Sequence, residues 1–220
     1  MQEFVDLSSY LNSTPGQLAN SILNCSDCGR DHKIPFQYVK SASNLVQEIP
    51  EVVEAIVGHK KPRAGVVYDR EIEEKVAAFV LEPFQKAGIV LQKIPLGEKG
   101  HLLAPEVGIG DETAKNLPDS LDILIGVGSG VISDLTKWIA TQRSLPFILV
   151  GTAASMNAYT SITATMTEDN VKTSRWLDPA SAVFLDANFL ATAPKEMTCA
   201  GIGDLLARNI SNADWKLSEH

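Results

Sequence analysis

The segment from Gly126 to Lys137 combines closely spaced glycines with serines, an aspartate and a lysine. An apolar, β-branched run precedes it, and apolar residues at helical spacing follow it. Glycines let the backbone turn tightly and bring amide N–H groups close to a ligand, and the positive end of the following helix points at the same place. Together these features can bind the pyrophosphate of a dinucleotide.

This glycine turn matches neither of the two commonest phosphate-binding motifs. No Gly-Lys-Ser/Thr closes it, so it is not a P-loop. The spacing is G-x-G-x-G, the turn follows a middle strand, and no acidic residue ends the next strand, so it also departs from the usual dinucleotide fingerprint. On the local pattern alone, a glycine-rich turn without a ligand stays a second interpretation.

Three further features contain residues that could do chemistry. Cys25, Cys28 and His32 have the spacing C-x2-C-x3-H, which is half of a zinc site or a surface turn with unliganded thiols, since structural zinc takes four ligands. Asp69 follows an apolar run and can bind a ligand or be a solvated loop residue. Asp204 can bind a metal or form an i,i+4 ion pair with Arg208.

Short apolar runs that alternate with helical patterns must position these residues. The predicted strands are Ala64–Tyr68, Ile89–Gln92, Asp122–Val127, Phe147–Val150 and Ala182–Leu185. A helix is predicted over Glu71–Lys86, with a kink or an end at Pro83, and a second helix begins near Gly130. This alternation predicts an α/β, Rossmann-like fold, with a parallel sheet, helices on both faces and ligands outside the carboxyl ends of the strands.

The composition changes after Leu185, and from Pro194 onward the pattern is helical. We therefore expect a nucleotide-binding α/β domain over residues 1–193. Residues 194–220 are expected to be the first helix of an all-helical second domain that is truncated.

Composition and charge exclude several classes of function. The chain has 220 residues, of which 45% are hydrophobic, so it can bury one sizeable core. The net charge of −8 disfavours binding to nucleic acid. No apolar run approaches the ~18 to 20 residues of a membrane span, and the N-terminus does not look like a signal peptide. With 3 cysteines, too few for a disulfide framework, the sequence predicts a cytoplasmic protein.

Three motifs, taken together, carry a family resemblance. Gly128–Lys137 resembles the glycine- and serine-rich turn of the iron-type alcohol dehydrogenase and dehydroquinate synthase superfamily. Gly151–Ser161 is similar to the Thr-Ala-x-Ser…Ser segment of glycerol-1-phosphate dehydrogenases. Ala200–Arg208, centred on Gly203 and Asp204, resembles the metal-binding helix of the same family. Three motifs in this order, over about 80 residues, are more specific than any one of them.

The resemblance implies a set of residues that contact NAD or NADP. The stretch around the pyrophosphate would be Gly130, Val131, Ile132, Ser133 and Asp134. Further cofactor contacts would come from Thr152, Ala153, Ala154, Ser155 and Ser161. Asp69 would hold a cofactor ribose, and because its charge disfavours a 2′-phosphate, NAD is favoured over NADP.

The resemblance also implies a metal site at Asp204, next to the substrate. Asp204 and two histidines would bind one divalent Zn, Ni or Fe ion, which would polarise the ketone of dihydroxyacetone phosphate. Hydride transfer from the nicotinamide would then give sn-glycerol 1-phosphate. We expect a phosphorylated polyol or ketone as the substrate and a homodimer as the assembly.

Two departures from the family pattern limit this expectation. The paired histidines should follow Asp204, but the sequence ends at His220, so we expect this chain to be the N-terminal part of the enzyme and inactive alone. Asn157 stands where many relatives have a substrate-binding Asp; it can hydrogen-bond a hydroxyl but bears no charge. A glycerol or simple-alcohol dehydrogenase, or a catalytically silent nucleotide-binding protein, are the alternatives.

Overall fold

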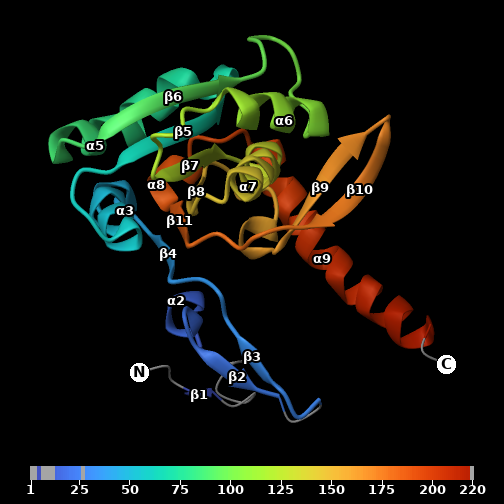
Figure 1. The fold of residues 1–220 in the computed structure, drawn as a ribbon. Coiled ribbons are helices and arrows are strands. Elements are labelled where there is room, and N and C mark those ends of the chain that lie inside the picture. The colour runs from blue at the N-terminus through green and yellow to red at the C-terminus, as the bar shows by residue number, and fades with distance from the viewer. Residues whose placement is uncertain (1–3, 6–12, 26–27, 219–220) are drawn as a thin grey trace.

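A computed structural model describes residues 4–5, 13–25 and 28–218 of the chain. At its centre lies a six-stranded sheet in the order β4-β11-β8-β7-β5-β6, in which every neighbouring pair is parallel (Figure 1). The strands are β4 (Tyr38–Ala42), β5 (Arg63–Asp69), β6 (Val90–Leu96), β7 (Ile123–Gly128), β8 (Phe147–Gly151) and β11 (Ala182–Asp186). All five predicted strands and the parallel α/β fold are confirmed.

Alternating side chains of the central strands face two separate cores. In β7, Ile125 packs with one hydrophobic cluster and its neighbour Leu124 with the other. The first cluster includes residues of α3 (Ile49–Val57) and of the helical segment that follows β5. The second includes residues of α6 (Val107–Asn116) and α7 (Gly130–Arg143). Helices therefore cover both faces, as a buried parallel sheet requires.

The predicted break at Pro83 takes the form of a π-helical turn. The helical segment consists of α4 (Glu73–Val76), the π-helical η3 (Ala77–Leu81) and α5 (Glu82–Ala87). Pro83 lies in the first turn of α5, where its missing N–H group is tolerated. The helix therefore continues past the proline, and the wide turn before it accommodates the lost hydrogen bond.

Three further parts of the sheet structure were not predicted. The edge strand β4 is one, and the antiparallel hairpin of β9 (Thr163–Glu168) and β10 (Val171–Trp176) is another. The third is a small sheet near the N-terminus, made of β1 (Phe4–Val5), β2 (Ile22–Asn24) and β3 (Asp31–Lys33). Short helical pieces complete the described chain: α2 (Pro15–Leu18), η1 (Leu45–Gln47), η2 (Arg70–Ile72), η4 (Ala158–Thr160) and α8 (Ala187–Leu190).

The last element, α9 (Lys195–Ser218), is a single helix that projects away from the sheet (Figure 1). It confirms the helix predicted from Pro194 onward. Leu205, Leu206 and Ile210 are 61%, 63% and 68% exposed on it, which is unusual for apolar side chains so close together. A domain boundary at residue 194 stays a prediction. Among the described residues, no helix is both long and apolar enough to cross a membrane.

Candidate functional site

The site forms where the strand order reverses direction. The chain leaves β5 for β6 on one side, whereas β7 lies on the other side of β5. Tyr68 of β5 pairs with Val127 of β7, so the carboxyl ends of these two strands lie side by side. Asp69 and the glycine turn thus meet at a topological switch point, which is where open parallel sheets bind ligands.

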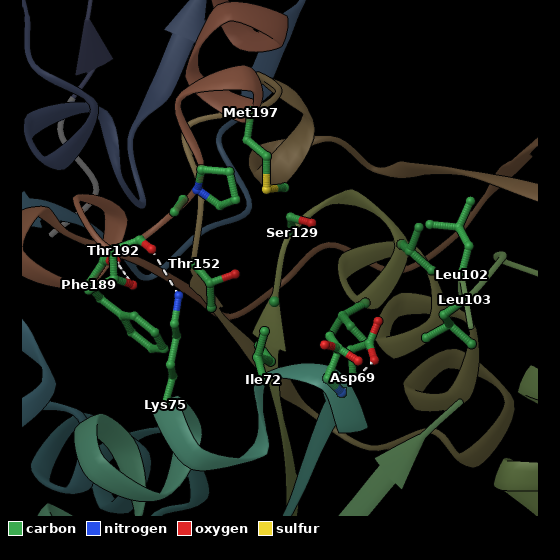
Figure 2. Close-up of a pocket in the computed structure, with 16 residues that line it drawn as sticks. Asp69, Ile72, Lys75, Leu102, Leu103, Ser129, Thr152, Phe189, Thr192 and Met197 are labelled. Carbon is green, nitrogen blue, oxygen red and sulfur yellow. Dashed lines mark hydrogen bonds between the residues drawn. The ribbon is translucent and has the colours of Figure 1, made fainter. Parts of the chain in front are cut away.

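A cavity of about 250 Å³ opens at this point (Figure 2). Its walls come from the turn after β5, the loop before α6, the glycine turn after β7, and the segment that leads into α9. Four of the residues expected to bind the cofactor line it, namely Asp69, Val131, Ile132 and Thr152. Segments far apart in sequence therefore converge on one cavity, as a ligand site requires.

Asp69 is held beside the cavity by its own turn. Its Oδ1 accepts a hydrogen bond from the backbone N–H of Glu71 at 2.9 Å and thereby caps η2. Glu71 in turn accepts a hydrogen bond from the N–H of Gly100 at 3.0 Å. The carboxylate of Asp69 is therefore fixed where it can accept hydrogen bonds from a ligand.

On the opposite wall of the cavity, Lys75 Nζ donates to the carbonyl of Thr192 at 2.8 Å, a contact that Figure 2 shows.

The glycine turn presents an uncapped helix N-terminus to the cavity. Strand β7 ends at Gly128, and α7 begins at Gly130. Ser129, the N-cap residue between them, makes no side-chain capping hydrogen bond. The first N–H groups of a helix have no partner within the helix, so those of α7 can bind an anion.

The three glycines of the turn serve two different purposes. A Cβ at Gly126 or Gly128 would overlap side chains of α7 itself, so these two are needed for packing. At Gly130 the nearest atom to an added Cβ is Met156 Sδ at 3.4 Å, which is ordinary contact with the end of a flexible side chain. Packing within the protein does not require glycine at position 130, which fits a role in ligand approach.

The side chain of Asp134 points into the protein. Its Oδ2 accepts a hydrogen bond from the N–H of Thr165 at 3.2 Å, and its Oδ1 lies 3.7 Å from Lys137 Nζ. Lys137 is fully buried and donates to the carbonyls of Ala158 at 3.0 Å and Thr163 at 3.1 Å. Burial raises the pKa of Asp134 and lowers that of Lys137. These two side chains tie α7 to the segment around β9.

Tyr159 joins the glycine turn to the loop after β8. Its hydroxyl lies 2.8 Å from the carbonyl oxygen of Ala153 and 3.3 Å from that of Gly128, and the Thr152 N–H donates to Gly128 at 3.1 Å. Burial raises the pKa of Tyr159 to about 12. Sequence reasoning missed this residue because only its position between the two segments reveals its role.

A second cavity, of about 230 Å³, lies beside the same loop and is also lined by α9. Ala153, Ala154 and Asn157 line it, together with Gly201 and Leu205. A Cβ at Gly201 would overlap the backbone of Ala154, so glycine lets α9 lie directly against the loop.

Asp204 and Asn157, both expected at the substrate, are brought together. Asp204 Oδ2 accepts a hydrogen bond from the Asn157 N–H at 3.0 Å. Arg208 Nη2 donates to Asn157 Oδ1 at 2.7 Å. Asp204 and Arg208 thus contact Asn157, and no ion pair between them is among those of the described residues.

The remaining residues expected to bind the cofactor line neither cavity. They are Gly130, Ser133, Asp134, Ser155 and Ser161. Ser133 is only 2% exposed, and the Ser161 hydroxyl lies 2.7 Å from that of Thr163. Their cofactor contacts stay predictions. In the stretch Gly130–Asp134, the backbone N–H groups without a partner within the helix are those of the first helical residues, because the Ser133 N–H already donates to the Ser129 carbonyl at 2.9 Å.

The sheet order and the glycine turn define a Rossmann-like α/β fold, and comparisons with known proteins identify the family. The family described as iron-containing alcohol dehydrogenase matches residues 40–194. The glycerol-1-phosphate dehydrogenase of Bacillus velezensis is 37% identical over 155 residues, or 70% of this chain and 39% of that protein. The same enzyme of Pyrococcus horikoshii is 33% identical over 175 residues, or 80% of this chain and 48% of that protein.

Solved structures agree on the fold. The NADH-dependent butanol dehydrogenase A of Thermotoga maritima superposes with a TM-score of 0.69 at 17% identity, over 80% of this chain and 48% of that one. A probable glycerol dehydrogenase of Sinorhizobium meliloti superposes with a TM-score of 0.63 at 22% identity, over 76% of this chain and 44% of that one. Because the family model matches residues 40–194, the chain belongs to the iron-containing alcohol dehydrogenase family. It spans half or less of the length of these relatives.

Proposed function

We propose that this chain is the cofactor-binding part of an NAD(P)-dependent and metal-dependent enzyme that reduces dihydroxyacetone phosphate to sn-glycerol 1-phosphate. The observation that carries the proposal is the convergence of Asp69, the uncapped N-terminus of α7 and Thr152 on one cavity at the switch point of the sheet. The relatives named glycerol-1-phosphate dehydrogenase support the choice of substrate.

The residues around the first cavity fit a dinucleotide. The free N–H groups and the positive end of α7 would stabilise the pyrophosphate, and Gly130 leaves room for it. The carboxylate of Asp69 would accept hydrogen bonds from ribose hydroxyls and repel a 2′-phosphate, so NAD is the expected cofactor. When bound, the nicotinamide supplies the hydride, and the protein supplies orientation and charge stabilisation.

The second cavity is the proposed position of the substrate. Because Arg208 binds Oδ1 of Asn157, the side-chain NH2 group of Asn157 can donate to a substrate oxygen. Asp204 holds the backbone of the same residue and would supply one metal ligand. Among the described residues, Asp204 has no group of ligand side chains around it, and one carboxylate does not hold a transition metal tightly. We therefore assign Asp204 one ligand position and leave the others to residues outside this part of the protein.

The test is oxidation of NADH with dihydroxyacetone phosphate and added Zn²⁺ or Ni²⁺. It compares the 220-residue chain with a chain extended to the length of the relatives. Metal polarisation is worth several kcal/mol, and each ~1.36 kcal/mol is about tenfold in rate, so the shorter chain should be on the order of a thousandfold slower. Comparable turnover by the 220-residue chain and the extended chain would show that the reaction depends on other residues of the 220-residue chain, and it would refute the assignment of Asp204 as a metal ligand. Reduction of NAD⁺ with glycerol, without oxidation of NADH by the phosphorylated ketone, would favour a glycerol dehydrogenase.

We also propose that the protein is a homodimer and that it is cytoplasmic. The homodimer is tested by analytical ultracentrifugation of the extended chain, for which a mass of two chains is expected. The cytoplasmic location is tested by fractionation of cells that produce the protein.

A further inference from the structure

In the small N-terminal sheet, hydrogen bonds among the described residues on either side of positions 26 and 27 bring the ends of β2 and β3 together. The two strands pair antiparallel, with Leu23 opposite His32. The Cys25 N–H donates to the carbonyl of Arg30 at 3.1 Å, and the Gly29 N–H donates to the carbonyl of Cys25 at 2.9 Å. Gly29 has a φ of 65°, in the left-handed region that glycine adopts without strain. The chain therefore reverses sharply directly after Cys28.

This turn gathers three metal-binding side chains. Side chains alternate between the faces of a strand, so Cys25, which lies opposite Arg30, shares a face with His32. Cys28 Sγ lies 3.0 Å from His32 Nε2, and the ligand atoms of Cys25, Cys28 and His32 all lie within 4.8 Å of one another. Tetrahedral zinc, with bonds of about 2.3 Å to sulfur and about 2.0 Å to nitrogen, spaces its ligands about 3.6 to 3.8 Å apart. Shifts of about an ångström would complete the geometry.

Among the side chains between positions 13 and 33 that the structure describes, little is buried that could stabilise the small sheet. All three residues of β3 are exposed. Of the residues between positions 13 and 33 whose burial is described, only Ser21 is buried, at 4% exposure. Short strands whose described side chains bury so little are marginal in water, and small units of this kind are commonly stabilised by a metal or by disulfides.

We propose that Cys25, Cys28 and His32 bind one Zn²⁺ ion that stabilises the N-terminal hairpin. Thiolate and imidazole ligands select zinc, and the two thiols release their protons as the two zinc–sulfur bonds form, without any change of oxidation state. Three protein ligands leave one coordination position for water. This site is separate from Asp204 and does not depend on the proposed function.

Metal content of the reduced 220-residue chain tests the proposal. After incubation with Zn²⁺ and dialysis against metal-free buffer, elemental analysis should find one zinc per chain. Cys25→Ser and Cys28→Ser should each lose it, whereas Cys199→Ser, which removes the exposed cysteine of α9, should keep it. Asp204→Asn should also keep it, which separates this metal from the one in the proposed function. Co²⁺ in place of zinc should give thiolate-to-metal absorption bands.

Hydrogen exchange tests the stabilising role. Removing zinc with a chelator should speed amide exchange in β2 and β3 and leave β5, β7 and β8 unchanged. Zinc that is retained in Cys25→Ser, or no stoichiometric zinc in the reduced protein, would overturn the site. Unchanged exchange of the hairpin after zinc removal would overturn its structural role. A Cys25–Cys28 disulfide formed in the presence of excess zinc, detected by mass spectrometry, would also count against the proposal.

Discussion

Replacing Gly130 with alanine should separate ligand binding from folding. The added Cβ would meet only Met156 Sδ, at 3.4 Å, and the position lies at the start of α7. A Gly→Ala change at a compatible position reduces the entropy of the unfolded chain and stabilises proteins by about 0.4–1 kcal/mol. The variant should therefore unfold at the same temperature as the parent protein or slightly above it.

The same methyl group should weaken cofactor binding. If the pyrophosphate binds the first N–H groups of α7, as we propose, the methyl group would crowd its approach, and a hydrogen bond to a charged group contributes about 1.5–3 kcal/mol. Loss of one such bond raises the dissociation constant for NADH by about 10- to 150-fold. Gly128 is not suitable for this test, because a Cβ there would overlap Ile132 and disturb the fold.

Calorimetric titration with NADH, together with thermal unfolding, measures both effects. Gly108→Ala is the matched control, since Gly108 also lies in the first turn of a helix, α6, with open space around its Cβ position, and lines neither cavity of the candidate site. The control should bind NADH as the parent protein does. If Gly130→Ala also binds NADH with unchanged affinity and unfolds normally, the pyrophosphate does not lie at the N-terminus of α7 and the reasoning is refuted.

Two further substitutions test other parts of the site. Asp69→Asn keeps an acceptor for the Glu71 N–H but loses the negative charge. In titrations, the preference for NADH over NADPH should therefore fall by about tenfold, the equivalent of ~1.4 kcal/mol. An unchanged ratio of the two dissociation constants would show that Asp69 is not part of the cofactor site. Tyr159→Phe should lower the free energy of unfolding by about 1–3 kcal/mol, because the carbonyls of Ala153 and Gly128 lose a donor. Burial raises the folded-state pKa of Tyr159 to about 12. The difference in free energy of unfolding between the parent protein and Tyr159→Phe should therefore have its full value below pH ~10 and shrink as the pH rises toward 12. Urea titrations measure it, and a difference that does not change with pH would contradict this reasoning.

The sheet was predictable wherever a strand is buried on both faces. Apolar, β-branched runs such as Ile123–Gly128 are short and lie between turns, which favours a strand buried on both faces over a helix. The edge strand β4 has polar and half-exposed residues, so it shows no such run. The hairpin of β9 and β10 does have a signal in the sequence, namely Asp169 followed by Asn170, two residue types that tolerate a positive φ. Their φ values are 50° and 63°, as a two-residue type I′ turn requires.

The candidate site was predictable in its backbone but not in its side chains. The order of elements alone places Asp69 and the glycine turn at the same edge of a parallel sheet. The burial of Lys137 and its contact with Asp134 depend on β9 packing against α7, which no local pattern encodes. The exposure of Leu205 and Leu206 was predictable, since a helix that extends beyond the hydrophobic core of the α/β sheet leaves its apolar residues uncovered.

The most direct test of the cofactor site is an NMR titration of the ¹⁵N-labelled chain with NADH. We predict saturable shifts that are largest at the amides of Gly130, Val131 and Ile132, with smaller ones at Asp69 and Thr152. The amides of β9 and β10 should stay unchanged and serve as the internal reference. The absence of saturable shifts, or shifts that centre away from the start of α7, would contradict the account.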